Sequence, residues 1–214
     1  MLLAPGSALA AGGPHLVDDS EVEAAGVCLL ESWLTRASGD RSQFNAGLGC
    51  TPKALPSLEL AVFVVHAGSP GPDETLVGLA PKVALRSPER GLGLAMAASL
   101  DYGLESDRFE NLSLTGIATF PAGERLRLNF NAGLGWSRGG PDGEMFVGAQ
   151  ADLAVGPGIS LMTEAFLPEH GKAGAQAGLR WIGGGGSVEL DLAAGRYVDG
   201  ATPTSVSIGV AVRR

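Results

Sequence analysis

Histidine, the most frequent catalytic base, is scarce in this chain of 214 residues. Of His15, His66 and His170, only His170 stands in a group that could do chemistry, beside Glu169 and just after the segment that carries Glu164. A hydrolytic site needs a nucleophile or an activated water with a base held next to it, usually histidine beside serine or aspartate. No such set is evident, and a solvated loop histidine explains His170 better. We therefore predict that the protein is not an enzyme.

Metal and nucleotide sites find equally little support in the sequence. His66 and Asp73 fall on one predicted loop, but two ligands do not complete a metal site. Gly-x-Gly pieces begin at Gly47, Gly91 and Gly133, yet none precedes a helical pattern as a dinucleotide-binding turn would. We predict no metal and no cofactor.

Charged and polar side chains at alternate positions of apolar segments are the remaining candidates for function. In residues 125–136 the leucines share one face of a strand with Phe130 and Trp136, and the arginines and asparagines share the other, because side chains in a strand have a period of two. The same sorting along the chain gives the candidate lumen-lining residues Glu59, Lys82, Asp101, Arg125, Arg127, Asn129, Asp152, Glu164, Arg180, Glu189 and Asp191. They either pair into a structural network, since an unpaired charge in an enclosed space is unfavourable, or line a water-filled, charged channel.

The elements that position these residues are strands throughout. Alternating patterns bounded by turn residues predict an all-β chain of about twelve strands. The predicted strands are residues 22–36, 42–51, 57–66, 75–85, 92–102, 111–120, 124–136, 144–155, 159–167, 174–182, 187–194 and 204–213. An even number of strands places both ends of the chain on one side of a barrel.

The apolar faces of these strands carry no ionisable group, as Leu58, Leu60, Val62 and Val64 illustrate. In a soluble β-sandwich such a face would be the core, whereas in a membrane barrel it would meet lipid and the mixed-charge face would line a lumen. The 33 glycines suit a curved, crowded interior, large aromatic residues such as Phe166 fall toward strand ends, and no helical periodicity supplies a cover for a sheet. We predict an antiparallel up-and-down transmembrane β-barrel, without a plug because no loop exceeds about ten residues.

The first residues indicate export. Residues 1–10 read Met-Leu-Leu-Ala-Pro-Gly-Ser-Ala-Leu-Ala and end in an Ala-x-Ala cleavage pattern, so we interpret them as the remnant of a signal peptide. We expect residues 11–20 to be a periplasmic N-terminal segment and residues 21–214 to be a single β-barrel domain. The net charge of −8 argues against nucleic acid and anionic membrane surfaces as partners.

The two cysteines test the register of the first hairpin. A turn at Gly39 places three pairs opposite one another on one face, namely Cys28 with Cys50, Leu30 with Leu48 and Leu34 with Phe44. A disulfide between Cys28 and Cys50 suits an oxidising periplasm, but two separate small thiols fit the pattern as well, because a cross-strand bridge needs a particular Cα spacing.

Two short pieces add a family resemblance, Leu30-Glu31-Ser32-Trp33 near the start and Leu58-Glu59-Leu60 further on. With them the chain resembles bacterial outer-membrane β-barrel proteins and, more loosely, the small transporter-like barrels found near phenol-degradation genes. The resemblance implies a place in the outer membrane of a Gram-negative bacterium, with outer-membrane lipid around the apolar face. We expect a porin-like passive channel or transporter for small solutes through a charged lumen. Two alternatives remain, a closed structural or docking barrel without transport and a soluble secreted β-sandwich.

Overall fold

The computed structural model describes residues 14–68, 70–139, 143–168, 173–197 and 204–214, and within these ranges the chain is built almost entirely of strands. The strands are β1 (Cys28–Ala37), β2 (Arg41–Cys50), β3 (Leu58–Gly68), β4 (Glu74–Arg86), β5 (Gly93–Gly103), β6 (Arg108–Pro121), β7 (Leu126–Ser137), β8 (Glu144–Gly156), β9 (Ile159–Pro168), β10 (Gly174–Gly183), β11 (Val188–Tyr197) and β12 (Ser205–Arg213). Two single-turn 3-10 helices, η1 (Pro88–Arg90) and η2 (Gly184–Gly186), lie between β4 and β5 and between β10 and β11.

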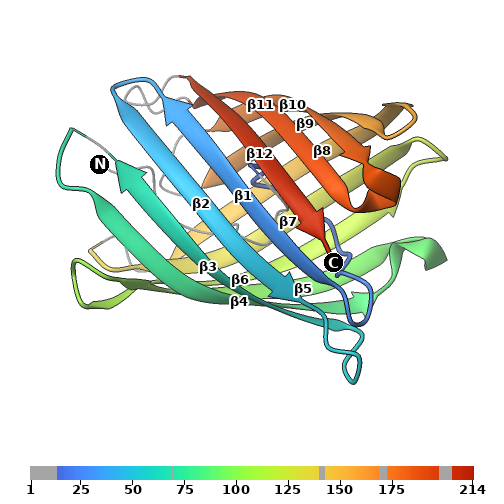
Figure 1. Ribbon diagram of the computed structural model, residues 1–214, viewed down its shortest axis with the longest axis horizontal. Helices are drawn as coiled ribbons and strands as arrows, with labels where there is room; N and C mark the ends of the chain where they lie inside the picture. Colours follow the sequence, from blue (N-terminus) through green and yellow to red (C-terminus); the bar gives the residue numbers. More distant parts are fainter. Residues whose placement is uncertain (1–13, 69, 140–142, 169–172, 198–203) are drawn as a thin grey trace.

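The strands form one closed barrel (Figure 1). Each strand pairs antiparallel with its neighbours in sequence, and β1 pairs with β12 to complete the ring. Leu34 lies opposite Ile208 across that closing pair and opposite Phe44 across the first hairpin. The predicted all-β, up-and-down antiparallel barrel of about twelve strands is therefore confirmed. Because the sheet closes on itself, the alternative of a two-sheet soluble sandwich is wrong.

Side chains separate onto the two faces of the barrel wall as the period of a strand requires. Large apolar side chains stand on the outside, including Ile208 (62% exposed) and Leu134 (61% exposed). Polar side chains point inward and are buried, including Lys82 (6% exposed) and Asp101 (5% exposed). An apolar exterior around a polar interior is the arrangement of a barrel that stands in lipid. Among the described residues, no helix is long and apolar enough to span a membrane.

The interior also holds apolar side chains. They form two small buried clusters, one of Phe63, Val65, Leu76 and Ala80 on β3 and β4, and one of Ala95, Ala97 and Ile117 on β5 and β6. These clusters fill part of the space that the barrel encloses, beside inward polar residues of the same strands such as Lys82 of β4 and Asp101 of β5.

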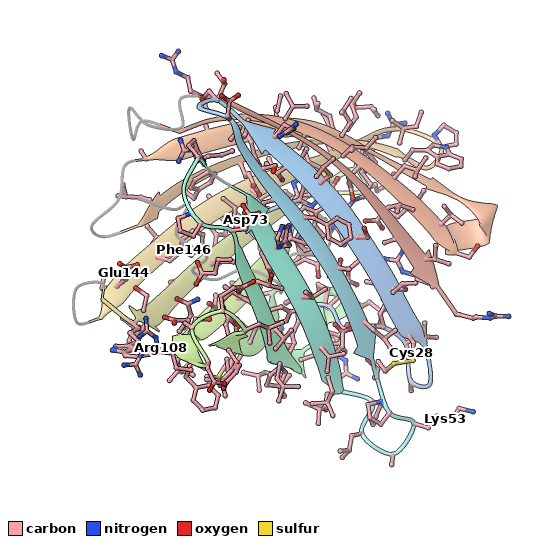
Figure 2. All side chains as sticks on the ribbon, turned by 60° about the vertical axis from the view of Figure 1, so that its left-hand side comes forward. Cys28, Lys53, Asp73, Arg108, Glu144 and Phe146 are labelled. Atoms are coloured by element: carbon pink, nitrogen blue, oxygen red, sulfur yellow. A yellow bond between two sulfur atoms is a disulfide. The ribbon has the colours of Figure 1, made fainter. Side chains whose placement is uncertain are left out.

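Both ends of the strand sequence meet at one end of the barrel, here called the terminal rim. Cys28, at the start of β1, exchanges two main-chain hydrogen bonds with Arg214, of 2.8 and 2.9 Å. Figure 2 shows Cys28 and the turn residue Lys53 at this end, and Asp73 and Arg108 at the opposite end. The two ends of the strand sequence thus share one side of the barrel, as an even number of strands requires.

The chain reaches the terminal rim from inside the barrel. β1 begins at Cys28 and not at residue 22, because the chain turns just before it. Gly26 has a φ of +86°, which glycine adopts without steric penalty, and the Val27 N–H donates to the Ala24 carbonyl at 2.8 Å. The predicted first strand, residues 22–36, therefore begins too early in the sequence.

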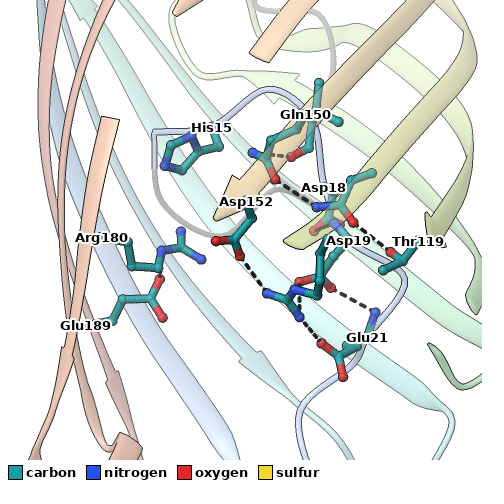
Figure 3. A network of polar contacts seen from close by, with 12 residues as sticks. His15, Asp18, Asp19, Glu21, Thr119, Gln150, Asp152, Arg180 and Glu189 are labelled. Atoms are coloured by element: carbon teal, nitrogen blue, oxygen red, sulfur yellow. Dashed lines mark hydrogen bonds and ion pairs between the residues drawn. The ribbon is translucent and has the colours of Figure 1, made fainter. Parts of the chain in front are cut away.

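Residues 14–23 precede this turn and run through the lumen, and we call them the inner segment (Figure 3). His15, Val17 and Ser20 are at most 3% exposed. We expected residues 11–20 in the periplasm and no plug. Residues 14–20 instead lie inside the barrel, because they find polar partners on the inward face of the wall. Residues 11–13 and the signal-peptide remnant at 1–10 lie outside the described residues.

Candidate functional site

The inward face of the wall holds the polar residues that the sequence singled out, with one exception. The residues found there are Glu59, Lys82, Asp101, Arg127, Asn129, Asp152, Glu164, Arg180, Glu189 and Asp191. Arg125 differs from them, because it precedes β7, which begins at Leu126, although it lines a hollow together with Arg127 and Asp152. Arg125 instead lies exposed in the turn between β6 and β7, at the terminal rim.

Wall side chains bind the main chain of the inner segment. Glu164 accepts hydrogen bonds from the N–H groups of Leu16 at 2.9 Å and Val17 at 3.2 Å. Further bonds follow the chain toward the terminal rim: from Gln150 to the Val17 carbonyl (3.1 Å), from the Asp18 N–H to Asn131 (2.7 Å), from Asn131 to the Asp18 carbonyl (2.9 Å), from the Ser20 N–H to Thr119 (2.8 Å) and from the Glu23 N–H to Glu59 (2.9 Å). These bonds satisfy peptide groups that would otherwise be buried without partners.

All four acidic residues of the inner segment also pair with bases of the wall. The close pairs are Asp18 Oδ2 with Lys82 Nζ (2.7 Å), Glu21 Oε2 with Arg127 Nη1 (2.6 Å) and Glu23 Oε1 with Arg213 Nε (2.9 Å). The Asp19 carboxylate lies 3.9 Å from both Lys82 Nζ and Arg127 Nη1. The Lys82 and Asp18 side chains are only 8% and 7% exposed, whereas those of Arg127 and Glu21 are 37% and 45% exposed. Exposed pairs contribute about 0–1 kcal/mol, while breaking an enclosed pair costs about 3–5 kcal/mol. The Lys82–Asp18 pair is therefore the strongest electrostatic anchor of the inner segment.

A second charged cluster joins β10 and β11. Arg180 Nε lies 2.8 Å from Glu189 Oε1 and 2.8 Å from Asp191 Oδ1. His15 of the inner segment lies near this cluster (Figure 3), with its ring nitrogens 3.6 Å from the Asp191 carboxylate and 3.9 Å from that of Glu164. Arg180 and Asp191 are direct cross-strand partners, so this part of the network belongs to the wall itself.

A disulfide joins Cys28 to Cys50 where the inner segment leaves the lumen. The two cysteines are register partners, as are the other pairs expected on that face, Leu30 with Leu48 and Leu34 with Phe44. The bond lies at the terminal rim and fixes the start of β1 beside the end of β2.

The candidates for catalysis and metal binding do not assemble into a site. His170 and Glu169 lie outside the described residues. His66 is exposed and its Nδ1 lies 3.1 Å from the Thr75 hydroxyl. Within the part of the chain that the structure describes, no group of three or more histidine, cysteine, aspartate or glutamate side chains could hold a metal ion.

Sequence reasoning missed the inner segment, although a signal was present. The acidic run of residues 18–23 complements the inward bases Lys82 and Arg127. Arg213 was also missed, although it follows Val212 on an alternating strand and must face the other way. Phe166, one of the large aromatic residues that the sequence places toward strand ends, is 6% exposed and packs inside the barrel against Gly174.

Comparison with solved structures identifies the fold. The KdgM porin is similar with a TM-score of 0.68 and 10% identity, covering 86% of this chain and 98% of that chain. The COG4313 outer membrane channel from Pseudomonas putida F1 has a TM-score of 0.68 and 12% identity, covering 92% and 98%. The NanC porin has a TM-score of 0.66 and 8% identity, covering 86% and 98%. At these identities the likeness concerns the fold, which is that of outer-membrane β-barrel porins and channels.

No curated protein matches the sequence. The closed barrel, its apolar exterior and its fold place the chain among the β-barrel proteins of the bacterial outer membrane. The match to a family model extends over residues 1–214, and the chain belongs to the family described as "Uncharacterised conserved protein UCP029691".

Proposed function

We propose that the protein is a passive channel for small solutes, with its charged lumen as the pathway and outer-membrane lipid around its apolar face. The inner segment occupies that pathway and closes it until it moves. No enzymatic activity and no cofactor form part of this proposal.

The observation that carries the proposal is the inner segment itself. The barrel encloses enough space for a stretch of polypeptide, bound mainly through polar contacts. If the segment moves aside, the space that it fills becomes available to water and solutes. The wall would then present Lys82, Arg127 and Arg213 next to Asp152 and Glu189, so the pathway would be lined by charges of both signs.

The similar structures support a channel of this kind. They include porins and an outer membrane channel, and the KdgM porin has been solved in complex with disordered oligogalacturonate. β-barrels of the outer membrane have many different functions. The polar lumen is the feature of this chain that favours transport over a structural role.

Solute influx into proteoliposomes tests the proposal. The test variant replaces residues 15–23 with glycine and serine at the same length, and the control variant replaces the exposed turn residues 53–57 in the same way. We expect faster influx of small sugars and amino acids through the test variant than through the wild type or the control. Absence of influx through a test variant that is folded, as judged by heat-modifiable migration in gels, would overturn the proposal.

A closed structural barrel is the second candidate, and the occupied lumen favours it. In that case the inner segment and the charge network serve only to fill and stabilise the barrel. Replacement of residues 15–23 would then lower the unfolding temperature and leave the membrane impermeable.

A further inference from the structure

The inner segment is held by features that would suit a ligand as well as a part of the same chain. Side chains of the wall make hydrogen bonds to its main chain. Asn131, for example, both accepts from and donates to the main chain of Asp18. The Thr119 and Gln150 side chains likewise contact a peptide N–H and a peptide carbonyl. Groups placed in this way bind the main chain of a peptide whatever its side chains are.

Glycines of the wall leave room for the side chains of the inner segment. A Cβ atom added at Gly148 would lie 2.6 Å from Val17 Cγ2, and one added at Gly93 would overlap the Ser20 hydroxyl and also crowd Pro88. Real Cβ atoms do not approach other atoms so closely. Any larger residue at either position would therefore push the inner segment away or shift the backbone of its own strand. The space beside these glycines therefore sets the positions at which an occupant of the lumen can carry side chains.

The charges set the chemical class of the occupant. Lys82, Arg127 and Arg213 meet acidic side chains at positions 18, 21 and 23 of the inner segment. Lys82 is enclosed and lies 3.9 Å from the Asp19 carboxylate as well, so it needs an anionic partner close by. An occupant that replaced the inner segment would have to supply carboxylates at this spacing.

We propose that the lumen is a binding site for acidic peptides, and that residues 14–23 occupy it as an internal ligand. The proposal deepens the channel function and rests on it, since a peptide can enter only when the inner segment leaves the lumen. It names the class of molecule that the lumen accepts, a linear peptide with acidic residues toward its C-terminal end.

A synthetic peptide with the sequence of residues 14–23, labelled with a fluorophore, tests the proposal in detergent. The proteins are the wild type and the full chain with residues 15–23 replaced by glycine and serine. We expect the peptide to bind the replaced variant at least about tenfold more tightly than the wild type, whose site is filled. A peptide with amides in place of all four acids should bind at least about tenfold more weakly, because it loses the ion pairs. A peptide with the residue order reversed should be weakened to a similar extent, because it loses the register of its main-chain hydrogen bonds.

Two results would overturn the peptide site. One is equal binding of the forward and reversed peptides, which would indicate a nonspecific charge effect. The other is competition by oligogalacturonate as effective as that by unlabelled peptide, which would indicate a general polyanion site. Gly148→Ala in the replaced variant supplies an independent check, and it should weaken peptide binding, whereas Gly47→Ala, whose added Cβ would have no neighbour closer than 3.5 Å, should not.

The influx experiment separates failure of this proposal from failure of the channel function. Influx that added peptide does not block, with no binding in detergent, refutes the peptide site and leaves the channel standing. Peptide binding by a variant that admits no solute refutes the channel and retains the binding site.

Discussion

Lys82 Nζ lies 2.7 Å from Asp18 Oδ2 inside the barrel, and this contact joins the middle of β4 to a segment that precedes every strand. Both side chains are enclosed, so each neutralises a charge that the other would otherwise leave in a poorly solvated space. The pair therefore contributes strongly to holding the inner segment in the lumen.

Removing Lys82 should release the inner segment. In Lys82→Met the Asp18 carboxylate loses its closest cation, at a cost of about 3–5 kcal/mol, which corresponds to roughly 100-fold or more in the equilibrium for release. A Val17→Cys reporter measures release through its reaction with a water-soluble maleimide, since Val17 is 1% exposed in the bound segment and the described residues contain no free cysteine. We expect faster labelling in Lys82→Met and slow labelling again when Asp18→Asn is added. Equal rates in all three proteins would show that the pair does not hold the segment.

A single methyl group on the wall should also weaken the inner segment. Gly148→Ala places a Cβ 2.6 Å from Val17 Cγ2, closer than side chains approach one another, so Val17 has to move. We expect faster solute influx into proteoliposomes than with the wild type. Gly47→Ala is the matched control, because its added Cβ makes only ordinary contacts, at 3.5 Å or more. Similar influx through both variants would contradict a tight fit between the wall and the segment.

Ion selectivity should depend on Arg127 and hardly on Arg125. Arg127 faces the lumen and pairs with Asp152 at 2.9 Å, whereas Arg125 lies exposed in the turn at the terminal rim. In the variant with residues 15–23 replaced, Arg127→Gln leaves Asp152 without this partner and should shift the reversal potential in a salt gradient toward cation selectivity. Arg125→Gln should produce a much smaller shift, since water and salt screen an exposed charge. Equal shifts would place the selective region at the rim.

A charged side chain on the outer face should destabilise the barrel in lipid. Ile208 lies near the middle of β12 and is 62% exposed, and its register partners Leu34 and Leu192 are apolar as well. Ile208→Arg should lower the free energy of unfolding from lipid by about 2–4 kcal/mol if the residue stands at the bilayer midplane. Ile208→Val is the control and should be nearly neutral. Urea titration in lipid vesicles measures both, and equal stability of the two variants would contradict contact of this face with lipid.

The sequence predicted the wall well because one short-range rule governs it. Alternation along a strand separates Ile208 from Ser207 and Leu134 from Gly133, and it needs no knowledge of distant parts of the chain. The pairing of Cys28 with Cys50 followed from the same local register.

The inner segment could not be predicted by that rule. Its contacts join residues far apart in the sequence, such as Asp18 with Asn131, and it has no regular period of its own. Residues 22–27 alternate enough to suggest a strand, yet the turn at Gly26 separates them from β1. Charge complementarity between the acidic run and the inward bases was the available signal, and it becomes informative only when the shape of the barrel is known.

Single-channel conductance in planar bilayers tests the central claim most directly, by comparing the wild type with the variant in which residues 15–23 are replaced by glycine and serine. We predict that the wild type is mostly closed and that the variant gives discrete, stable conductance steps, which the synthetic peptide of residues 14–23 blocks. Silence from both proteins, after their insertion has been verified, would contradict a channel closed by its own inner segment.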